Sequence, residues 1–262
     1  MPSSRYSFKR KVRFLIAKLA YHGILLPVLE REMSILRFIL NRGDCVIDVG
    51  ANSGIYSFYL SYLVGSTGRV ISFEPNEDNY DELVRLSKTM RINNIYLFKT
   101  ALGDSDGKTI FNIPKNRKGL LDDTRAYVSS LSLKNDYLIE REVEVSTLDS
   151  VLTKYFANDS VHIKFLKIDV EGYEYFIIKG GLNMLRKDKP IILCEIEEKW
   201  QNRYGKTSNS LISLILSIAN YEMFIYDRQK LRPARAIVDG YNNYVFIDKE
   251  QVTNKNLKKL FQ

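Results

Sequence analysis

The chain has 262 residues, of which 45% are hydrophobic and 27% are charged, and its formal net charge is +8. This composition is typical of a protein that buries a core, and it excludes a disordered or collagen-like chain. The two cysteines, Cys45 and Cys194, are too few for a disulfide framework and stand in apolar runs. We therefore expect buried free thiols, which favours a cytoplasmic location. No apolar run reaches the length of about 18 residues that a membrane-spanning helix needs.

The positive charge is concentrated in the first 42 residues, which hold nine of the 39 Lys and Arg residues and two of the 31 acidic ones. Residues 5–29 combine this charge with apolar residues three and four positions apart, which indicates one face of a helix. We expect this segment to pack on the domain. Peripheral membrane contact through residues 5–29 and polyanion binding are alternatives. A secretory signal does not fit, because Lys18 and His22 interrupt the apolar stretch.

Short apolar runs alternate with helical stretches from residue 43 onward, which predicts βα units and a parallel sheet. The predicted core strands are 45–49, 70–73, 95–99, 162–168 and 191–195, followed by strands at 221–226 and 244–247. The predicted helices are 53–64, 77–90, 147–156, 173–187 and 208–219.

A less regular segment at 104–160 interrupts this order, and its alternating runs at 109–113 and 141–145 predict two more strands. We therefore divide the chain into three parts. They are a basic helical segment 1–42, an α/β domain 43–250 with an insertion at about 104–160, and a tail 251–262.

The most informative segment is 46–54, with the sequence Val-Ile-Asp-Val-Gly-Ala-Asn-Ser-Gly. A strand ends at Asp48, and the turn that follows holds Gly50 and Gly54 before a helix begins. Glycine lets a ligand approach the backbone, and a helix N-terminus offers unpaired N–H groups. Glu74 ends the next strand, where an acid can accept hydrogen bonds from both ribose hydroxyls of a nucleoside.

The spacing of this segment does not fit a dinucleotide site. The fingerprint G-x-G-x-x-G has a glycine where this chain has Asn52, and Gly54 comes one residue early. Asp48 precedes the first glycine, and a carboxylate there would repel a pyrophosphate but suits the ammonium group of S-adenosylmethionine. The segment therefore favours S-adenosylmethionine over a nicotinamide cofactor.

Several motifs in order resemble the FkbM-type methyltransferases. They extend over about residues 30–200 and include Leu-Lys-Ile-Asp-Val-Glu-Gly-Tyr-Glu at 166–174; the others are 43–54, 73–76, 101–104, 146–149 and 180–181. The resemblance implies a Rossmann-like class I methyltransferase fold, a mostly parallel seven-stranded sheet with helices on both faces. It also implies O-methylation of a hydroxyl on a saccharide or natural product.

The resemblance further implies which residues bind the cofactor. The methionine end would lie beside the loop after the first strand, the ribose beside Glu74, and the adenine beside residues after the second and third strands. The implied cofactor-binding residues are Asp48, Gly50, Ala51, Asn52, Gly54, Tyr56, Ser57, Glu74, Pro75, Asn76, Ala101, Leu102 and Asp169.

Asp169 and Glu171 follow the fourth core strand, at the edge where open α/β sheets bind ligands. Methylation of a hydroxyl requires a group that takes its proton. The two histidines do not suit this role, because His22 is in the N-terminal segment and His162 opens a strand at the far end. We expect Asp169 to position cofactor or acceptor and Glu171 to be the base.

Two further acids near strand ends are Glu174, which could instead pair with Lys167, and Glu195. Such carboxylates could alternatively hold a divalent ion. No spacing of His or Cys supports a metal site, so we predict none.

The acceptor is the least determined part of the prediction. Residues 115–134 mix basic residues with serines and a tyrosine, which suits a hydroxyl-rich or phosphorylated acceptor or a solvated hairpin. Trp200 and Tyr204 are placed to stack on a sugar face. We expect a small-molecule or glycan acceptor rather than a nucleic acid. The absence of an Asn/Asp-Pro-Pro-Tyr motif after the fourth core strand argues against methylation of base amino groups.

Other functions remain open from the sequence. They are an N-methyltransferase or nucleic-acid methyltransferase, a non-catalytic protein that retains the fold, and a nicotinamide dehydrogenase.

Overall fold

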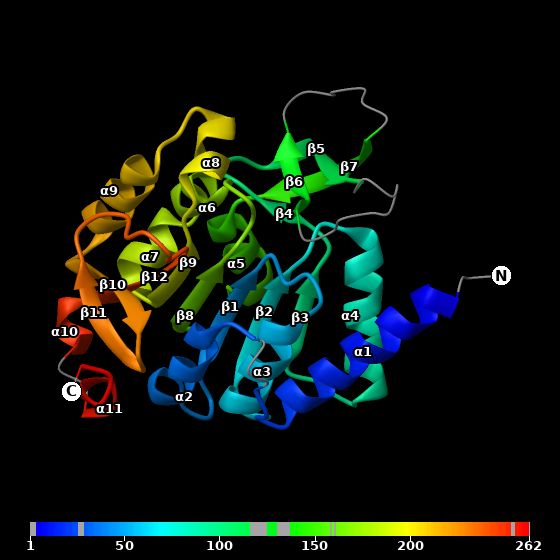
Figure 1. Ribbon diagram of the computed structural model, residues 1–262, viewed down its shortest axis with the longest axis horizontal. Helices are drawn as coiled ribbons and strands as arrows, with labels where there is room; N and C mark the ends of the chain where they lie inside the picture. Colours follow the sequence, from blue (N-terminus) through cyan, green and yellow to red (C-terminus); the bar gives the residue numbers. More distant parts are fainter. Residues whose placement is uncertain are drawn as a thin grey trace.

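The computed structural model describes residues 4–25, 29–115, 125–129, 137–157, 159, 161–252 and 255–261. The strands of its central sheet are β1 (Cys45–Val49), β2 (Arg69–Phe73), β3 (Ile95–Phe98), β8 (Ile163–Ile168), β9 (Ile191–Glu195), β10 (Tyr221–Asp227), β11 (Lys230–Ala234) and β12 (Asn243–Asp248). Their order is β11-β10-β12-β9-β8-β1-β2-β3 (Figure 1). The five strands from β9 to β3 are parallel, and the other three pair antiparallel. The seven predicted strands are present, and β11 adds an eighth at the edge.

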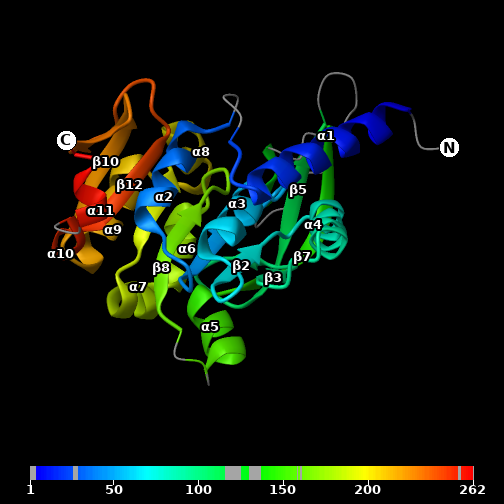
Figure 2. The same cartoon turned by 90° about the horizontal axis from the view of Figure 1, so that it is seen from below.

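Helices cover both faces of this sheet. One core contains residues of α1 (Ser4–Tyr21), η1 (Arg31–Ile35), α2 (Leu36–Ile39), α3 (Ile55–Val64), α4 (Glu77–Thr89) and α11 (Lys255–Lys258). The other contains residues of α5 (Leu148–Phe156), α6 (Glu174–Gly180), α7 (Leu182–Asp188) and α9 (Ser208–Ile218). Shorter connections are α8 (Glu198–Gln201), η3 (Asn202–Tyr204) and α10 (Lys249–Val252). Figure 2 shows α2 and α3 on one side of the sheet and α5 and α7 on the other.

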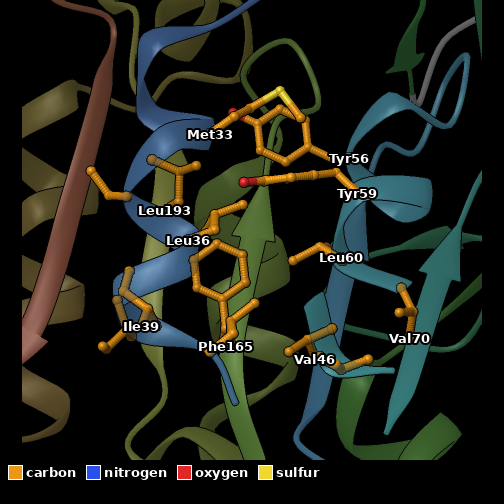
Figure 3. Packing of buried hydrophobic residues seen from close by; sticks show 14 of the residues in the cluster. Met33, Leu36, Ile39, Val46, Tyr56, Tyr59, Leu60, Val70, Phe165 and Leu193 are labelled. Atoms are coloured by element: carbon orange, nitrogen blue, oxygen red, sulfur yellow. The ribbon is translucent and has the colours of Figure 1, made fainter. Parts of the chain in front are cut away.

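The first core fixes the helix that follows the glycine loop. Val46, Val70 and Phe165 project from neighbouring strands toward Leu36 of α2 and Leu60 of α3 (Figure 3). All five side chains are fully buried. Burial of a side chain of this size stabilises a fold by about 1.5–3 kcal/mol. The sheet and α3 therefore hold the loop between β1 and α3 from both sides.

The helix predicted over 173–187 is wrong in one respect, because the chain forms two helices there, α6 and α7, which meet at Gly181. A Cβ atom at Gly180 would lie 2.0 Å from the Gly103 carbonyl oxygen. Glycine is therefore required for the close approach of α6 to the loop at Gly103. The sequence pattern did not indicate this contact between distant segments.

The insertion forms a second sheet of β4 (Ala101–Leu102), β5 (Gly107–Pro114), β6 (Tyr127–Ser129) and β7 (Leu138–Ser146), in the order β4-β7-β5-β6. The strands predicted at 109–113 and 141–145 are confirmed as parts of β5 and β7, which pair antiparallel. Figure 1 shows this small sheet at one end of the central strands. Within the predicted acceptor segment 115–134, residues 116–124 and 130–134 lie outside the described residues.

The N-terminal helix α1 packs against α3. Ala17 and Ala20 are fully buried in that contact, whereas Val12 and Leu15 are 38% and 56% exposed. This contact agrees with the predicted packing of the segment on the domain; membrane contact through residues 5–29 and polyanion binding stay predictions. In the part of the chain that the structure describes, no helix has the length and hydrophobicity to cross a bilayer.

The two cysteines and the C-terminal residues also belong to the folded domain. Cys45 and Cys194 are buried free thiols, as predicted. Leu257 and Leu260, from the predicted tail 251–262, are buried in the same core as α1 and α3.

Candidate active site

A cavity of about 340 Å³ lies at the carboxyl ends of β1, β2, β8 and β9. This volume falls in the range of about 300–1,000 Å³ that is usual for small-molecule sites. Its polar walls come from the loops that follow these strands, and its apolar wall from the small sheet and α6. The residues that line it include Glu30, Gly50, Ala51, Asn52, Tyr56, Glu74, Pro75, Ala101, Leu102, Phe111, Val128, Lys167, Asp169, Glu171 and Glu195.

The loop after β1 is tied to its neighbours through its backbone. The N–H groups of Gly50 and Ala51 both donate to the Phe73 carbonyl, over 3.1 and 3.0 Å. Gly50 has a positive φ of 78°, and a Cβ atom there would lie 2.0 Å from the Asp169 carbonyl oxygen. Glycine at this position therefore lets the loops after β1 and β8 contact each other.

Gly54 serves helix packing and does not line the cavity. It precedes α3 with a φ of 81°, and a Cβ atom there would lie 2.2 Å from Leu83 Cδ2. Gly54 therefore meets a requirement of close packing, whereas Gly50 also lines the cavity, and its contact with a ligand stays a prediction.

Glu74 is buried, with 4% of its surface exposed, and its carboxylate is held by the backbone. The Asn52 N–H donates to Oε2 over 2.7 Å, and the Asn76 N–H donates to Oε1 over 2.9 Å. Burial raises the pKa of Glu74 to about 7, although these two hydrogen bonds and one from the Asn79 side chain favour the ionised form. A carboxylate has about four acceptor sites, so capacity remains for a hydroxyl in the cavity.

A buried cation lies at the centre of the site. Lys167 Nζ is 3.2 Å from Asp169 Oδ2 and 3.6 Å from Asp48 Oδ1, and it donates to the Gly50 carbonyl over 3.2 Å. Burial alone would lower the pKa of Lys167, but the two carboxylates hold it above its ordinary value. Asp48 is fully buried and accepts a hydrogen bond of 2.6 Å from Ser57. Asp48 and Ser57 therefore support the loops from behind instead of lining the cavity.

Glu174 shapes the turn that follows β8. It accepts hydrogen bonds from the Val170 and Gly172 N–H groups over 3.2 and 3.1 Å, and so does not take the alternative role of partner to Lys167. This turn places Glu171 in a left-handed conformation, with a φ of 58°. A non-glycine residue in that region is uncommon and is often held at functional sites.

Glu171 lines the cavity with an unsatisfied carboxyl oxygen. Its Oε2 atom is buried and has no hydrogen-bond partner among the described residues. Burial raises the pKa of Glu171 to about 7, and the nearby carboxylate of Asp169 adds to the shift. A buried acceptor without a partner indicates a place for a ligand group.

The cavity also has walls that the sequence pattern did not indicate. Glu30, from the basic N-terminal segment, accepts a hydrogen bond of 2.5 Å from the Tyr56 hydroxyl. Phe111 and Val128 come from the insertion. The predicted sugar-stacking residue Tyr204 instead donates from its hydroxyl to the Val128 carbonyl over 2.7 Å.

The predicted site residues thus fall into two groups. Those that line the cavity are Gly50, Ala51, Asn52, Tyr56, Glu74, Pro75, Ala101, Leu102, Asp169 and Glu171. Those that stand behind it are Asp48, Gly54, Ser57 and Asn76, which support the lining loops. His162 is remote, at the start of β8, where its ring lies 3.2 Å from Asp188.

Residues 48–223, well over half the chain, match the family described as the methyltransferase FkbM domain. The chain belongs to the FkbM methyltransferase family. No curated protein sequence matches it.

Solved structures share the fold at low sequence identity. A methyltransferase FkbM from Methylobacillus flagellatus is 18% identical with a TM-score of 0.51, over 86% of this chain and 49% of that one. The chain therefore spans about half the length of that protein. A putative methyltransferase from Streptococcus mutans in complex with SAH is 11% identical with a TM-score of 0.47, over 85% of this chain and 98% of that one. A SAM-dependent O-methyltransferase from Thermotoga maritima is 15% identical with a TM-score of 0.43, over 88% and 69%.

The FkbM family match supports the predicted Rossmann-like class I fold and S-adenosylmethionine as the cofactor. The residues of this chain fit that cofactor. Glu74 retains acceptor capacity that suits a ribose hydroxyl, and Leu102 gives the cavity an apolar surface that suits an adenine. The carboxylates of Glu30 and Asp169 provide the negative charge that a sulfonium and an ammonium group require.

Proposed function

We propose that this protein is an S-adenosylmethionine-dependent O-methyltransferase that acts on a hydroxyl of a saccharide or another natural product. One observation carries the proposal. Glu171, whose buried carboxyl oxygen Oε2 has no hydrogen-bond partner among the described residues, lines the same cavity as Glu74 and the loop after β1. The cavity therefore combines an acid suited to a nucleoside with a group that can take the proton of a hydroxyl during methyl transfer.

Each part of the cavity has a distinct role in this proposal. Bound S-adenosylmethionine would supply a methyl group activated by the adjacent sulfonium. Glu74 would hold the ribose, and the loop at Gly50 would hold the methionine end. Glu171 would accept the proton of the acceptor hydroxyl at its carboxylate. Its pKa of about 7 suits this role, because a general base acts best when its pKa is near the working pH.

The acceptor would enter between the loop after β8 and the N-terminal segment. Glu30, Asp169 and Glu171 line that region, and carboxylates accept hydrogen bonds from the hydroxyls of a polyol. Lys167 is already paired with Asp48 and Asp169, so it is less available to an anionic acceptor. We therefore favour a neutral, hydroxyl-rich small molecule or glycan as the partner, and a cytoplasmic location given the buried free thiols.

The proposal is tested by methyl transfer from radiolabelled S-adenosylmethionine to a panel of glycans, hydroxylated metabolites, amines and RNA. We expect labelling of hydroxyl acceptors only, and loss of at least about a hundredfold in rate in Glu171→Gln with cofactor affinity retained. Glu222→Gln, an exposed acid on β10, is the matched control. Labelling of amines or RNA instead would assign a different acceptor class.

A further inference from the structure

Glu195 lies next to Asp169 across two neighbouring strands. Ile168 of β8 and Cys194 of β9 are register partners, so the residues that follow them, Asp169 and Glu195, stand side by side at the strand ends. Both line the cavity, so their carboxyl groups lie close to each other at its edge. The sequence indicated Glu195 only as one of several acids near strand ends.

Two carboxyl groups placed side by side can form a hydrogen bond only if one of them keeps its proton. The proton belongs on Glu195, because Asp169 faces Lys167 on its other side, with 3.2 Å between Oδ2 and Nζ. Burial raises the pKa of Glu195 above its ordinary value, and the charge of Asp169 acts in the same direction. The other acids that face Glu195, namely Glu171 and Glu174, act in the same direction. Two carboxyl groups in contact cannot both ionise without a large energetic cost.

The protonation state of Glu195 affects the net charge of the ionisable side chains around Lys167. Asp48, Lys167 and Asp169 form a row of alternating charge, with Nζ lying 3.6 and 3.2 Å from the two carboxylates. With neutral Glu195 at its end, the row carries one net negative charge. Glu30 and Glu171 line the same cavity, so an ionised Glu195 would add a further negative charge next to Asp169.

We propose that Glu195 is a positioning residue for methyl transfer, which keeps its proton and donates it to Asp169. In this role it fixes the Asp169 carboxylate against Lys167 and adds no further negative charge beside it. The inference rests on the proposed function and adds a residue and a charge state to it. Glu195 itself neither takes the acceptor proton nor needs to touch the acceptor.

A comparison of Glu195→Gln with Glu195→Ala tests whether Glu195 acts as a neutral hydrogen-bond donor. Glutamine keeps a neutral donor of nearly the same shape, whereas Glu195→Ala removes the donor. We expect Glu195→Gln to bind S-adenosylmethionine and S-adenosylhomocysteine with the wild-type ratio of affinities, within about twofold. We expect Glu195→Ala and Asp169→Asn to lower the affinity for S-adenosylmethionine relative to S-adenosylhomocysteine by about tenfold, since a charge-assisted contact is lost.

The protonation state is measured directly by carbon-13 NMR of protein labelled at glutamate carboxyl carbons, with the Glu195 signal assigned by its loss in Glu195→Gln. We expect the chemical shift of a protonated carboxyl at pH 7.5. The shift of an ionised carboxylate, or a loss of sulfonium preference in Glu195→Gln equal to that in Asp169→Asn, would overturn the proposal. If neither ligand binds the wild type, the proposed function fails, and the NMR titration still reports whether Glu195 holds the proton.

Discussion

The Asn52 N–H donates to Glu74 Oε2 over 2.7 Å, which joins the loop after β1 to the acid after β2. Asn52 adopts a left-handed φ of 46° to make this contact. The residue that replaces a glycine of the dinucleotide fingerprint therefore has a structural task of its own. It orients the carboxylate that is proposed to hold the ribose.

Replacement of Glu74 tests this arrangement first. In Glu74→Ala the Asn52 and Asn76 N–H groups lose their acceptor, and the ribose loses its partner. Each hydrogen bond to a charged group contributes about 1.5–3 kcal/mol, so we expect cofactor affinity to fall at least about tenfold. Isothermal titration with S-adenosylhomocysteine measures the change, with Glu222→Gln as the control. Unchanged affinity would show that Glu74 does not hold the ribose.

Because the pKa of Glu74 is raised, the free energy of unfolding should depend on pH. Its folded-state pKa of about 7 exceeds the ordinary value of 4.5, so its stabilising contribution is full below pH 4.5 and is lost as pH rises through 7. We expect the free energy of unfolding of the unliganded protein to decline less between pH 5 and 8 in Glu74→Gln than in the wild type. The difference should be on the order of 2 kcal/mol. Urea denaturation at both pH values measures it, and parallel pH profiles would contradict the assignment.

The close contact at Gly50 predicts a severe effect of a single methyl group. A Cβ atom there would overlap the Asp169 carbonyl, whereas Gly240, with a φ of 82°, has no atom within 4 Å of such a Cβ. Both changes carry the cost of a left-handed conformation, about 1–2 kcal/mol. We expect only Gly50→Ala to lower the free energy of unfolding by about a further 2 kcal/mol. We also expect it to abolish cofactor binding. Equal thermal stability of Gly50→Ala and Gly240→Ala would contradict the loop geometry.

The packing of α1 predicts which of its residues tolerate charge. Ala20 is fully buried against α3, and Leu15 is 56% exposed. We expect Ala20→Glu to destabilise the protein by about 3 kcal/mol or more, because an unpaired charge enters the core, and Leu15→Glu to change stability by less than about 0.5 kcal/mol. Thermal denaturation compares the two. If Ala20→Glu left the thermal stability unchanged, α1 would not be held in the core as the structure shows.

The main sheet could be predicted from sequence because its signals are local. The buried strands at 45–49 and 191–195 are short apolar runs with helical stretches between them, and parallel pairing follows from that alternation. The glycine loop and Glu74 were also found, because each stands directly at a strand end. Their roles were only partly found, since whether Gly54 faces a ligand or Leu83 depends on how helices pack.

Contacts between distant segments were not available to that reasoning. Glu30 reaches Tyr56 from outside the predicted domain, and Phe111 and Val128 reach the cavity from the insertion. The placement of Asp169 beside Glu195 depends on the order of β8 and β9 in the sheet. Such features follow from tertiary structure, which one sequence does not encode as a local pattern.

Cofactor binding is the most direct test of the central claim. Isothermal titration of the purified protein with S-adenosylmethionine, S-adenosylhomocysteine and NAD compares the affinities of three adenosine-containing ligands for this cavity. We expect the first two to bind with a one-to-one stoichiometry and NAD to show no binding. Binding of NAD, or of none of the three, would contradict the assignment of this cavity to S-adenosylmethionine.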